Sequence, residues 1–335
     1  MELKMGIVGY GYWGPNLVRN FNATDGIGVT MVCDQSPKSQ VKVKKAFPNV
    51  VVCADFRELT RSPDVDVVAV ATPVASHFEI ARDALENGKH LFMEKPFTAS
   101  VREAETLVEL AARKGLMIMV DHTFLFTGAV RKIKDLMDGQ ELGKILYYDS
   151  TRVNLGLFQH DVNVIWDLAP HDFAVMDFIL SSQPIALAAH GFDHYRRGLE
   201  NVAYVTMYLE DDIVSHFNFN WLSPVKLRTT LVGGQKKMLV WDDLEADEKI
   251  KIYDKGVTVE DRDAVNKMMV GYRSGDMHAP KLDRQEALSL EAEYLVECIA
   301  TGRPPVNDGL SGLKIVKLLE ATDESMRSQG RLVRL

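Results

Sequence analysis

The sequence predicts an α/β domain with a doubly wound parallel sheet, followed by an α+β domain with a large, open-faced and mostly antiparallel sheet. Short apolar runs alternate with helical patterns through the first 121 residues, and a glycine-rich turn follows the first of these runs. After residue 122 the runs become alternating and follow one another with short polar turns. A chain of 335 residues is long for one core, so we expect two domains at 1–121 and 122–335. The C-terminal helices are expected to pack back toward the first domain.

The runs of the first domain are apolar nearly throughout, which is typical of strands covered on both faces. Glycine follows two of the helical patterns directly and indicates where those helices end. The expected strands are Leu3–Val8, Gly28–Cys33, Val50–Cys53, Val65–Ala71, His90–Met93 and Met117–Val120. The expected helices are Asn16–Phe21, Ser39–Phe47, Phe56–Arg61, His77–Asn87 and Val101–Lys114.

A G-x-G-x-x-G turn lies between the first strand and the first helix, with Gly9, Gly11 and Gly14 as its glycines. The first glycine permits a tight turn, the second lets the backbone approach a pyrophosphate, and the third lets the helix pack closely. The N–H groups at the start of the helix would then face the phosphates. The motif predicts that this turn, including Tyr12 and Trp13, binds a dinucleotide.

Asp34 closes the second strand, 20 residues beyond Gly14, where dinucleotide-binding folds carry an acidic residue for the ribose hydroxyls. A surface aspartate that merely ends a strand is the alternative. The carboxylate would repel the 2′-phosphate of NADP, and the nearest following cation is Lys38. We therefore predict NAD as the cofactor in preference to NADP.

The second domain is predicted from a different pattern. Residues 216–221 alternate strictly between polar and aromatic, which suits an antiparallel strand with one face on the core and the other on solvent or a partner subunit. Such a sheet commonly buries a face against a second copy, so we expect a homodimer or homotetramer. Residues 264–281 have the weakest pattern and are expected to form a surface loop. The expected helices are Ala129–Met137, Leu168–Leu180, Arg284–Thr301 and Leu310–Gln329, and the expected strands are Lys144–Val153, Ala186–Phe192, Val202–Leu209, Ile213–Trp221, Leu227–Val232, Lys237–Trp241 and Leu332–Leu335.

Two short constellations carry residues suited to proton and hydride chemistry. Glu94-Lys95-Pro96 follows a parallel strand, whose carboxyl end faces the crevice where such sheets bind ligands. Proline restricts Lys95 to extended backbone and can form a cis bond. A solvated turn is the alternative.

The second constellation is Asp167 and His171, which are four residues apart and share one helix face. Asp167 is expected to cap the helix, with Pro170 near its start. One interpretation is a capping aspartate beside a packed histidine. The other is a carboxylate that orients an imidazole acting as acid or base near neutral pH.

These motifs, in this order, resemble the Gfo/Idh/MocA oxidoreductase family from end to end. The series runs from the glycine turn through Ala71-Thr72-Pro73, His77 and Glu94-Lys95-Pro96 to the Asp167-x-x-x-His171 pair and Gly302-Arg303-Pro304-Pro305. The resemblance implies a Rossmann domain and an open-faced sheet domain with Lys95, Asp167 and His171 as the catalytic trio. It also implies cofactor contacts from Thr72, Pro73, His77 and Glu94.

Three segments (10–20, 121–126 and 163–171) resemble the branch acting on nucleotide sugars, notably UDP-N-acetylglucosamine 3-dehydrogenases. The resemblance implies hydride transfer between NAD and a sugar ring carbon, with C3 of a UDP-linked N-acetylated sugar as the expected site. Keto-deoxysugar nucleotide reduction, free sugar or inositol oxidation, and a non-catalytic NAD- and sugar-binding regulator are the alternatives. The expected substrate-binding residues are Arg152, Asn154, Asn163 and Trp166, with Gln159, His160 and Asp161 as further loop candidates.

Composition excludes several other classes. A net charge of −8 argues against nucleic acid or an anionic membrane as partner, and no apolar run reaches the ~18 residues of a membrane span. The first residues lack a signal-peptide layout, and the three cysteines are widely separated. We expect a cytoplasmic protein with buried thiols. The histidines show no metal-ligand spacing, so no metal is expected.

Overall fold

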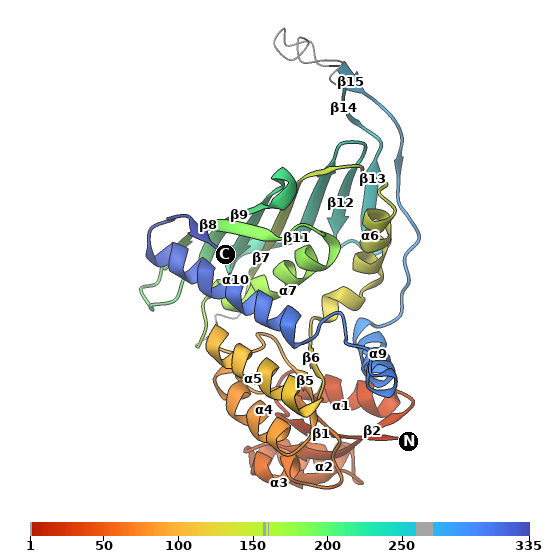
Figure 1. Ribbon diagram of the computed structural model, residues 1–335, viewed down its shortest axis with the longest axis vertical. Helices are drawn as coiled ribbons and strands as arrows, with labels where there is room; N and C mark the ends of the chain where they lie inside the picture. The colour runs from red at the N-terminus through yellow and green to blue at the C-terminus, as the bar shows by residue number, and fades with distance from the viewer. Residues whose placement is uncertain (1, 157–158, 160, 259–270) are drawn as a thin grey trace. The chain divides into compact units, whose positions relative to one another are not determined.

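The computed structural model describes residues 2–156, 159, 161–258 and 271–335 (Figure 1). The chain forms two compact units. Unit 1 contains residues 1–126 and 285–320, and unit 2 contains residues 127–284 and 321–335. This division differs from the predicted boundary at residue 121, because the chain returns to unit 1 near its C-terminus and leaves it again within the last helix.

Unit 1 is built on a six-stranded sheet in the order β3-β2-β1-β4-β5-β6. Every neighbouring pair in it is parallel. This is the strand order of doubly wound dinucleotide-binding folds, and it confirms the predicted fold class. The strands are β1 (Leu3–Val8), β2 (Ile27–Cys33), β3 (Val51–Cys53), β4 (Val67–Val70), β5 (His90–Met93) and β6 (Ile118–Val120).

The helices of unit 1 connect these strands and cover the sheet. They are α1 (Gly14–Ala23), α2 (Pro37–Ala46), α3 (Phe56–Thr60), α4 (His77–Glu86), α5 (Val101–Lys114) and α9 (Ala287–Thr301), with 3₁₀ turns η1 (Val74–Ser76) and η2 (Thr123–Phe126). Helix α9 comes from the far end of the chain, yet its Leu288 and Leu295 are buried in the same apolar core as Met5 and Phe21. Burial of this face explains why α9 belongs to unit 1.

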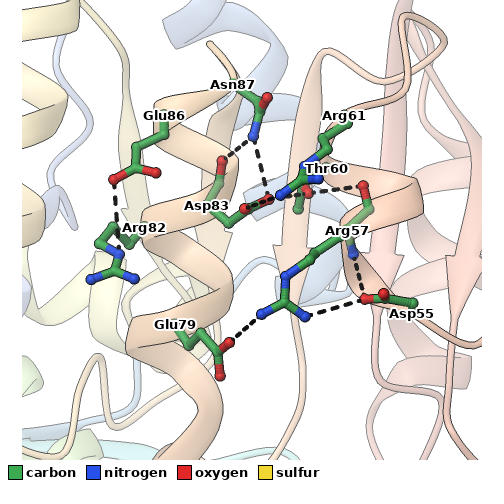
Figure 2. A network of polar contacts seen from close by, with 9 residues as sticks. All are labelled: Asp55, Arg57, Thr60, Arg61, Glu79, Arg82, Asp83, Glu86 and Asn87. Carbon is green, nitrogen blue, oxygen red and sulfur yellow. Dashed lines mark hydrogen bonds and ion pairs between the residues drawn. The ribbon is translucent and has the colours of Figure 1, made fainter.

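A polar network joins the surfaces of α3 and α4 (Figure 2). Arg57 Nη2 donates to Glu79 Oε1 at 2.6 Å, and Arg57 also pairs with Asp55 at 3.6 Å. The carboxylate of Asp83 accepts from Thr60 and from Arg61. The Arg57 charge is thus compensated by two carboxylates next to the β2–β3 end of the sheet.

Unit 2 is built on a nine-stranded sheet in the order β16-β13-β12-β11-β7-β10-β9-β8-β17. The β7–β10 pair is parallel and the other pairs are antiparallel, as predicted for a mostly antiparallel sheet. The strands are β7 (Ile145–Leu155), β8 (Pro184–Phe192), β9 (Val202–Leu209), β10 (Val214–Asn220), β11 (Leu222–Gly234), β12 (Met238–Asp242), β13 (Ile250–Tyr253), β16 (Met277–His278) and β17 (Val333–Arg334). Helices α6 (Gly128–Asp138) and α7 (Val164–Ile179), the end of α10 (Gly309–Arg327), the turn η3 (Glu210–Asp212) and a ribbon of β14 (Gly256–Thr258) and β15 (Gly271–Arg273) complete the unit.

The two faces of this sheet differ as the alternation at β10 predicts. Phe217 and Phe219 are fully buried, and Phe173 of α7 meets both rings edge-on. The opposite side of β9 exposes Tyr204 and Tyr208. The helix α7 therefore packs on one face, and an aromatic-rich face remains exposed in the single chain.

The prediction of a surface loop at 264–281 is wrong in part. Gly271–Arg273 forms β15 against β14, and Met277–His278 extends the large sheet beside β13. These strands are two or three residues long, too short for a periodic pattern to reveal them. Residues 264–270 lie outside the described part of the chain.

Candidate functional site

The glycine turn of unit 1 has the conformation that its sequence requires. Gly9 has φ +101°, and a Cβ there would lie 2.4 Å from the carbonyl oxygen of Ala71. A Cβ on Gly14 would lie 2.3 Å from the Gly9 oxygen, so both positions exclude any larger residue. Around a Cβ on Gly11 no atom lies within 4 Å. The second glycine thus borders open space at the N-terminus of α1, as needed for backbone approach to a phosphate.

Asp34 lies at the carboxyl end of β2 beside this turn. Its Oδ2 accepts from the backbone N–H of Tyr10 and its Oδ1 from that of Ser36, each at 2.7 Å. Asp34 borders a cavity of about 540 Å³ together with Gly9, Gly11 and Thr72. A fixed carboxylate, a glycine turn and a helix N-terminus around one cavity fit an adenosine diphosphate group.

His77 lies buried between two backbone segments, and its predicted cofactor contact stays a prediction. It is 1% exposed, with Nδ1 3.0 Å from the Pro96 oxygen and Nε2 2.9 Å from the Thr72 oxygen. Burial lowers the pKa of the imidazole despite these carbonyl partners. Because both ring nitrogens face backbone oxygens, His77 ties the Thr72-Pro73 turn to the segment after Lys95. Thr72 and Pro73 themselves border the cavity.

Lys95 follows β5 and is joined to Pro96 by a cis peptide bond. The preceding residue, Glu94, lies level with Asp121, because β5 and β6 pair in register up to Met93 and Val120. Asp121 Oδ2 accepts from the indole Nε1 of Trp13 at 3.0 Å. Through this bond Trp13 connects the glycine turn to the ends of β5 and β6. The neighbouring Tyr12 is 94% exposed.

Three carboxyl groups lie together at the ends of β5 and β6, and we call them the buried carboxyl cluster. They belong to Glu94, Asp121 and Glu291 of α9. Burial and the Asp121 charge raise the pKa of both glutamates well above the ordinary value. Glu291 is 0% exposed and its Oε1 accepts from Asn307 Nδ2 at 2.8 Å. Sequence analysis missed Glu291, since a single glutamate in a helical pattern gives no sign of being buried.

In unit 2 the helix that carries Asp167 and His171 begins earlier than predicted. Asn163 is its N-cap, and its Oδ1 accepts from the N–H groups of Ile165 and Trp166, each at 3.1 Å. Asp167 consequently lies in the first turn and is not the cap, and Pro170 lies inside the helix. The Asp-x-x-Pro spacing imitated a helix start, but the Asn163 side chain satisfies the N–H groups four residues sooner.

Asp167 and His171 share one face of α7, as their spacing predicts, and both are partly exposed. Trp221, at the end of β10, donates from Nε1 to Asp167 Oδ2 at 3.0 Å and is 1% exposed. This donor fixes the Asp167 carboxylate on the helix face that carries His171. Trp221 ends the alternating run of residues 216–221, and that pattern predicted only that it packs.

The structure assigns Arg152 to the core of unit 2. Its Nε donates to Asp172, and both side chains are 6% exposed. Ser150 Oγ also donates to Asp172, at 2.6 Å. Asp172 directly follows His171, so this ion pair anchors α7 to β7 below the candidate residues. Arg152 thus holds α7 to β7, and its predicted sugar contact stays a prediction.

The other expected substrate residues divide similarly. Asn163 and Trp166 both donate to Asp323, at 3.0 and 2.8 Å, and hold the start of α7. The predicted sugar contacts of these two residues stay predictions. Asn154 is partly exposed on β7. A Cβ built on Gly156 would lie 3.0 Å from the Asn154 amide nitrogen and 3.5 Å from the Trp221 ring, so both side chains lie close to Gly156. Gln159 and Asp161 are exposed, and His160 lies outside the described residues.

Within residues 2–156, 159, 161–258 and 271–335, no group of three or more His, Cys, Asp or Glu side chains could hold a metal ion. Over the same residues no helix is both long and apolar enough to cross a membrane. All three cysteines are buried free thiols.

Comparison with known proteins identifies two domains. Residues 3–122 match the oxidoreductase family with an NAD-binding Rossmann fold, and residues 130–240 match the GFO/IDH/MocA C-terminal domain. The UDP-N-acetylglucosamine 3-dehydrogenase of Acidithiobacillus ferrooxidans is 23% identical over 94% of this chain and 95% of its own. The scyllo-inositol 2-dehydrogenase (NADP(+)) IolW of Bacillus subtilis is 30% identical over 49% of this chain and 44% of its own. For several curated relatives, including the Escherichia coli oxidoreductase YdgJ at 51%, the match spans about half of their length.

Solved structures agree in fold over the whole chain. The GnnA structure of the Acidithiobacillus enzyme has a TM-score of 0.83 at 22% identity and covers 98% of both chains. A levoglucosan dehydrogenase in complex with NADH has a TM-score of 0.85 at 18% identity and covers 100% of this chain and 99% of its own. The glycine turn, Asp34 and the domain matches together make unit 1 an NAD-binding Rossmann domain. The protein belongs to the Gfo/Idh/MocA family of oxidoreductases.

Proposed function

We propose that the protein is an NAD-dependent dehydrogenase that oxidises a sugar ring hydroxyl, with C3 of a UDP-linked N-acetylated sugar as the reacting carbon. The observation that carries the choice of substrate is the extent of the match. The UDP-N-acetylglucosamine 3-dehydrogenase aligns over 94% of this chain, whereas the inositol dehydrogenase IolW aligns over 49%. The match to the nucleotide-sugar enzyme therefore includes the second unit, where we expect the substrate to be selected, and this supports the proposal.

Three side chains divide the chemistry in this proposal. The Lys95 ammonium donates a hydrogen bond to the reacting oxygen and stabilises its developing negative charge. The His171 imidazole accepts the hydroxyl proton, and Asp167, fixed by Trp221, holds the imidazole in the required orientation.

The NAD-binding residues of unit 1 complete the site. NAD supplies the acceptor for the hydride that leaves the sugar carbon. The glycine turn would hold its phosphates, and Asp34 would accept from the adenosine ribose hydroxyls. No proposed step needs a metal ion, since Lys95 provides the positive charge at the reacting oxygen.

A panel of substrates tests the proposal. The purified protein is incubated with NAD and UDP-, dTDP- and free sugars, NADH is followed at 340 nm, and products are identified by mass spectrometry. We expect turnover of a UDP-linked N-acetylated sugar to a 3-keto product. Turnover of free inositol or glucose without activity on any nucleotide sugar would overturn the substrate assignment. Tight NAD binding with no turnover across the whole panel would instead favour a non-catalytic regulator.

Matched histidine variants test the roles of the residues. His171→Ala is expected to lower kcat by ~10²–10⁴-fold, the range for a positioned acid–base group. His278→Ala, which removes an exposed histidine of the same unit, is expected to keep wild-type activity. A fully active His171→Ala protein would refute the assignment of the base.

A further inference from the structure

The buried carboxyl cluster of unit 1 has more acceptor oxygens than donors. Glu94 Oε1 and Glu291 Oε2 are buried, and neither accepts from any N–H or O–H group of the described residues. Both carboxyl groups lie beside the Asp121 carboxylate. A proton on each glutamate is what turns contacts between carboxyl groups into hydrogen bonds.

The neighbouring groups distinguish Asp121 from the two glutamates. The Asp121 carboxylate accepts hydrogen bonds from two side-chain donors, Trp13 Nε1 and Thr123 Oγ1. Glu291 accepts from Asn307 Nδ2. Lys95 favours ionisation of the adjacent Glu94, whereas burial and Asp121 oppose it more strongly. His122, the remaining titratable neighbour, has its pKa lowered by burial to about 4 and is therefore neutral near pH 7.

Among the carboxyl groups of the cluster, Glu94 lies where we expect the nicotinamide ring, whose charge differs between NAD⁺ and NADH. A dinucleotide on this fold straddles the carboxyl ends of the strands, with its adenosine half at Asp34 after β2 and its second half at β4–β6. Glu94 directly follows β5 and precedes Lys95. The nicotinamide ring is a cation in NAD⁺ and neutral in NADH.

We propose that Glu94 and Asp121 share a proton, with Glu291 as a supporting donor, and that binding of NAD⁺ expels this proton to solvent whereas binding of NADH leaves it in place. The O–H bond of the Glu94 carboxyl breaks, the proton passes to buffer, and no electron is transferred. The cluster gains one negative charge opposite the ring cation. It regains the proton when the ring becomes neutral.

The expected size of the effect follows from Coulomb's law. A unit positive charge ~6 Å from a carboxyl lowers its pKa by about two units at an effective dielectric constant of ~20. Such a shift releases a large fraction of a proton at pH values between the pKa of the carboxyl with bound NAD⁺ and its pKa without it. The affinity for NAD⁺ then rises by up to about tenfold per pH unit within this range, while that for NADH changes little.

Calorimetric titration measures the released proton directly. The full-length protein is titrated with NAD⁺ and with NADH, in phosphate and in Tris, between pH 6 and pH 9. The dependence of the binding enthalpy on the ionisation enthalpy of the buffer gives the number of protons released. We expect roughly half a proton or more for NAD⁺ at the maximum, and close to zero for NADH.

Three isosteric variants locate the proton. Glu94→Gln is expected to abolish release because the donor carboxyl is gone. Asp121→Asn is expected to diminish it, because the negative neighbour that helps to hold the proton on Glu94 is gone while burial remains. Glu291→Gln, the matched control within the cluster, replaces one neutral donor by another and is expected to retain release. Circular dichroism establishes that each variant is folded before titration.

The result that overturns the proposal is tight NAD⁺ binding without proton release in the wild-type protein. Equal release with NADH, or undiminished release in Glu94→Gln, overturns it as well. The proposal rests on NAD binding, and the experiment contains no sugar. Its failure is therefore distinguishable from failure of the proposed dehydrogenase activity, which the substrate panel reports.

Discussion

Replacing Trp221 by Phe removes the one indole donor that the structure assigns to Asp167, and we expect it to lower the rate of the proposed reaction. The bond from Nε1 to Asp167 Oδ2 is 3.0 Å long and buried, since Trp221 is 1% exposed. A hydrogen bond to a charged group contributes about 1.5–3 kcal/mol. If the bond holds Asp167 in its working orientation, its loss lowers kcat by about 10–100-fold, at roughly 1.4 kcal/mol per tenfold.

Trp241 of β12 offers a matched control. It is 4% exposed, and its Nε1 is buried without a partner among the described residues. Trp241→Phe removes the same atoms from the same unit but breaks no hydrogen bond to a charge. We expect its kcat to stay within about twofold of wild type, and its free energy of unfolding to exceed that of Trp221→Phe by about 1.5–3 kcal/mol.

The assay is steady-state NADH formation with the sugar found active, together with urea unfolding of both variants. KM for NAD should be unchanged in Trp221→Phe, because the glycine turn belongs to the other unit. A folded Trp221→Phe protein with wild-type kcat would refute the argument that this bond positions Asp167. Equal losses of kcat in both variants would show that packing alone matters.

Four further outcomes are expected. Asp172→Asn leaves the buried Arg152 guanidinium without its counter-charge and should cost about 3–5 kcal/mol of unfolding free energy in denaturant titrations; a loss under 1 kcal/mol would contradict this. NAD should bind more tightly than NADP in calorimetric titrations because Asp34 repels the 2′-phosphate, and equal affinities would show that a cation such as Lys38 compensates. Burial lowers the pKa of His122 to about 4 from its ordinary 6.5, so the folded state binds fewer protons than the unfolded state, and stability falls as the pH drops from about 6.5 to 4. At roughly 1.4 kcal/mol per pH unit, the loss amounts to about 3 kcal/mol. His122→Gln should therefore have a flatter profile of melting temperature against pH. Light scattering at micromolar concentration should give the mass of a dimer or tetramer that covers the exposed tyrosine face, and a monomer mass would contradict that expectation.

The first unit was largely predictable from the sequence because its signals are local. Strands such as Leu3–Val8 and His90–Met93 are bounded by turn residues and are apolar nearly throughout, and the structure has them at the predicted positions. The glycine turn was predictable for a stricter reason. At Gly9 and Gly14 a Cβ would lie within 2.5 Å of backbone oxygens, so the sequence can hold no other residue there.

The differences arise where distant segments meet. Helix α9 joins unit 1 through Leu288 and Leu295. The C-terminal helices were expected to pack toward the first domain, but no local pattern tells where along the chain this return begins and ends. The start of α7 was misplaced because Asp167 and Pro170 imitate a helix start while the Asn163 side chain caps it earlier. Local sequence shows spacing along one helix and does not show which tertiary partner a side chain meets.

The candidate site shows the same division between chemistry and support. Lys95, Asp167 and His171 could be selected from residue type, spacing and resemblance to the family. Their supports could not, because Trp221 reaches Asp167 of α7 from the end of β10, and Glu291 reaches the carboxyl cluster from a helix nearly 200 residues after Glu94. Arg152 was predicted to bind substrate from its charge, but its burial with Asp172 is a tertiary property.

Isotope transfer tests the central claim most directly. The protein is incubated with NAD and UDP-N-acetylglucosamine that carries deuterium at C3, and the coenzyme product is analysed by mass spectrometry. The account predicts that NADH forms with one deuterium and that the sugar product is the unlabelled 3-ketone. Unlabelled NADH would show that another carbon reacts, and the absence of NADH formation with this and every other sugar tested would contradict the proposed dehydrogenase.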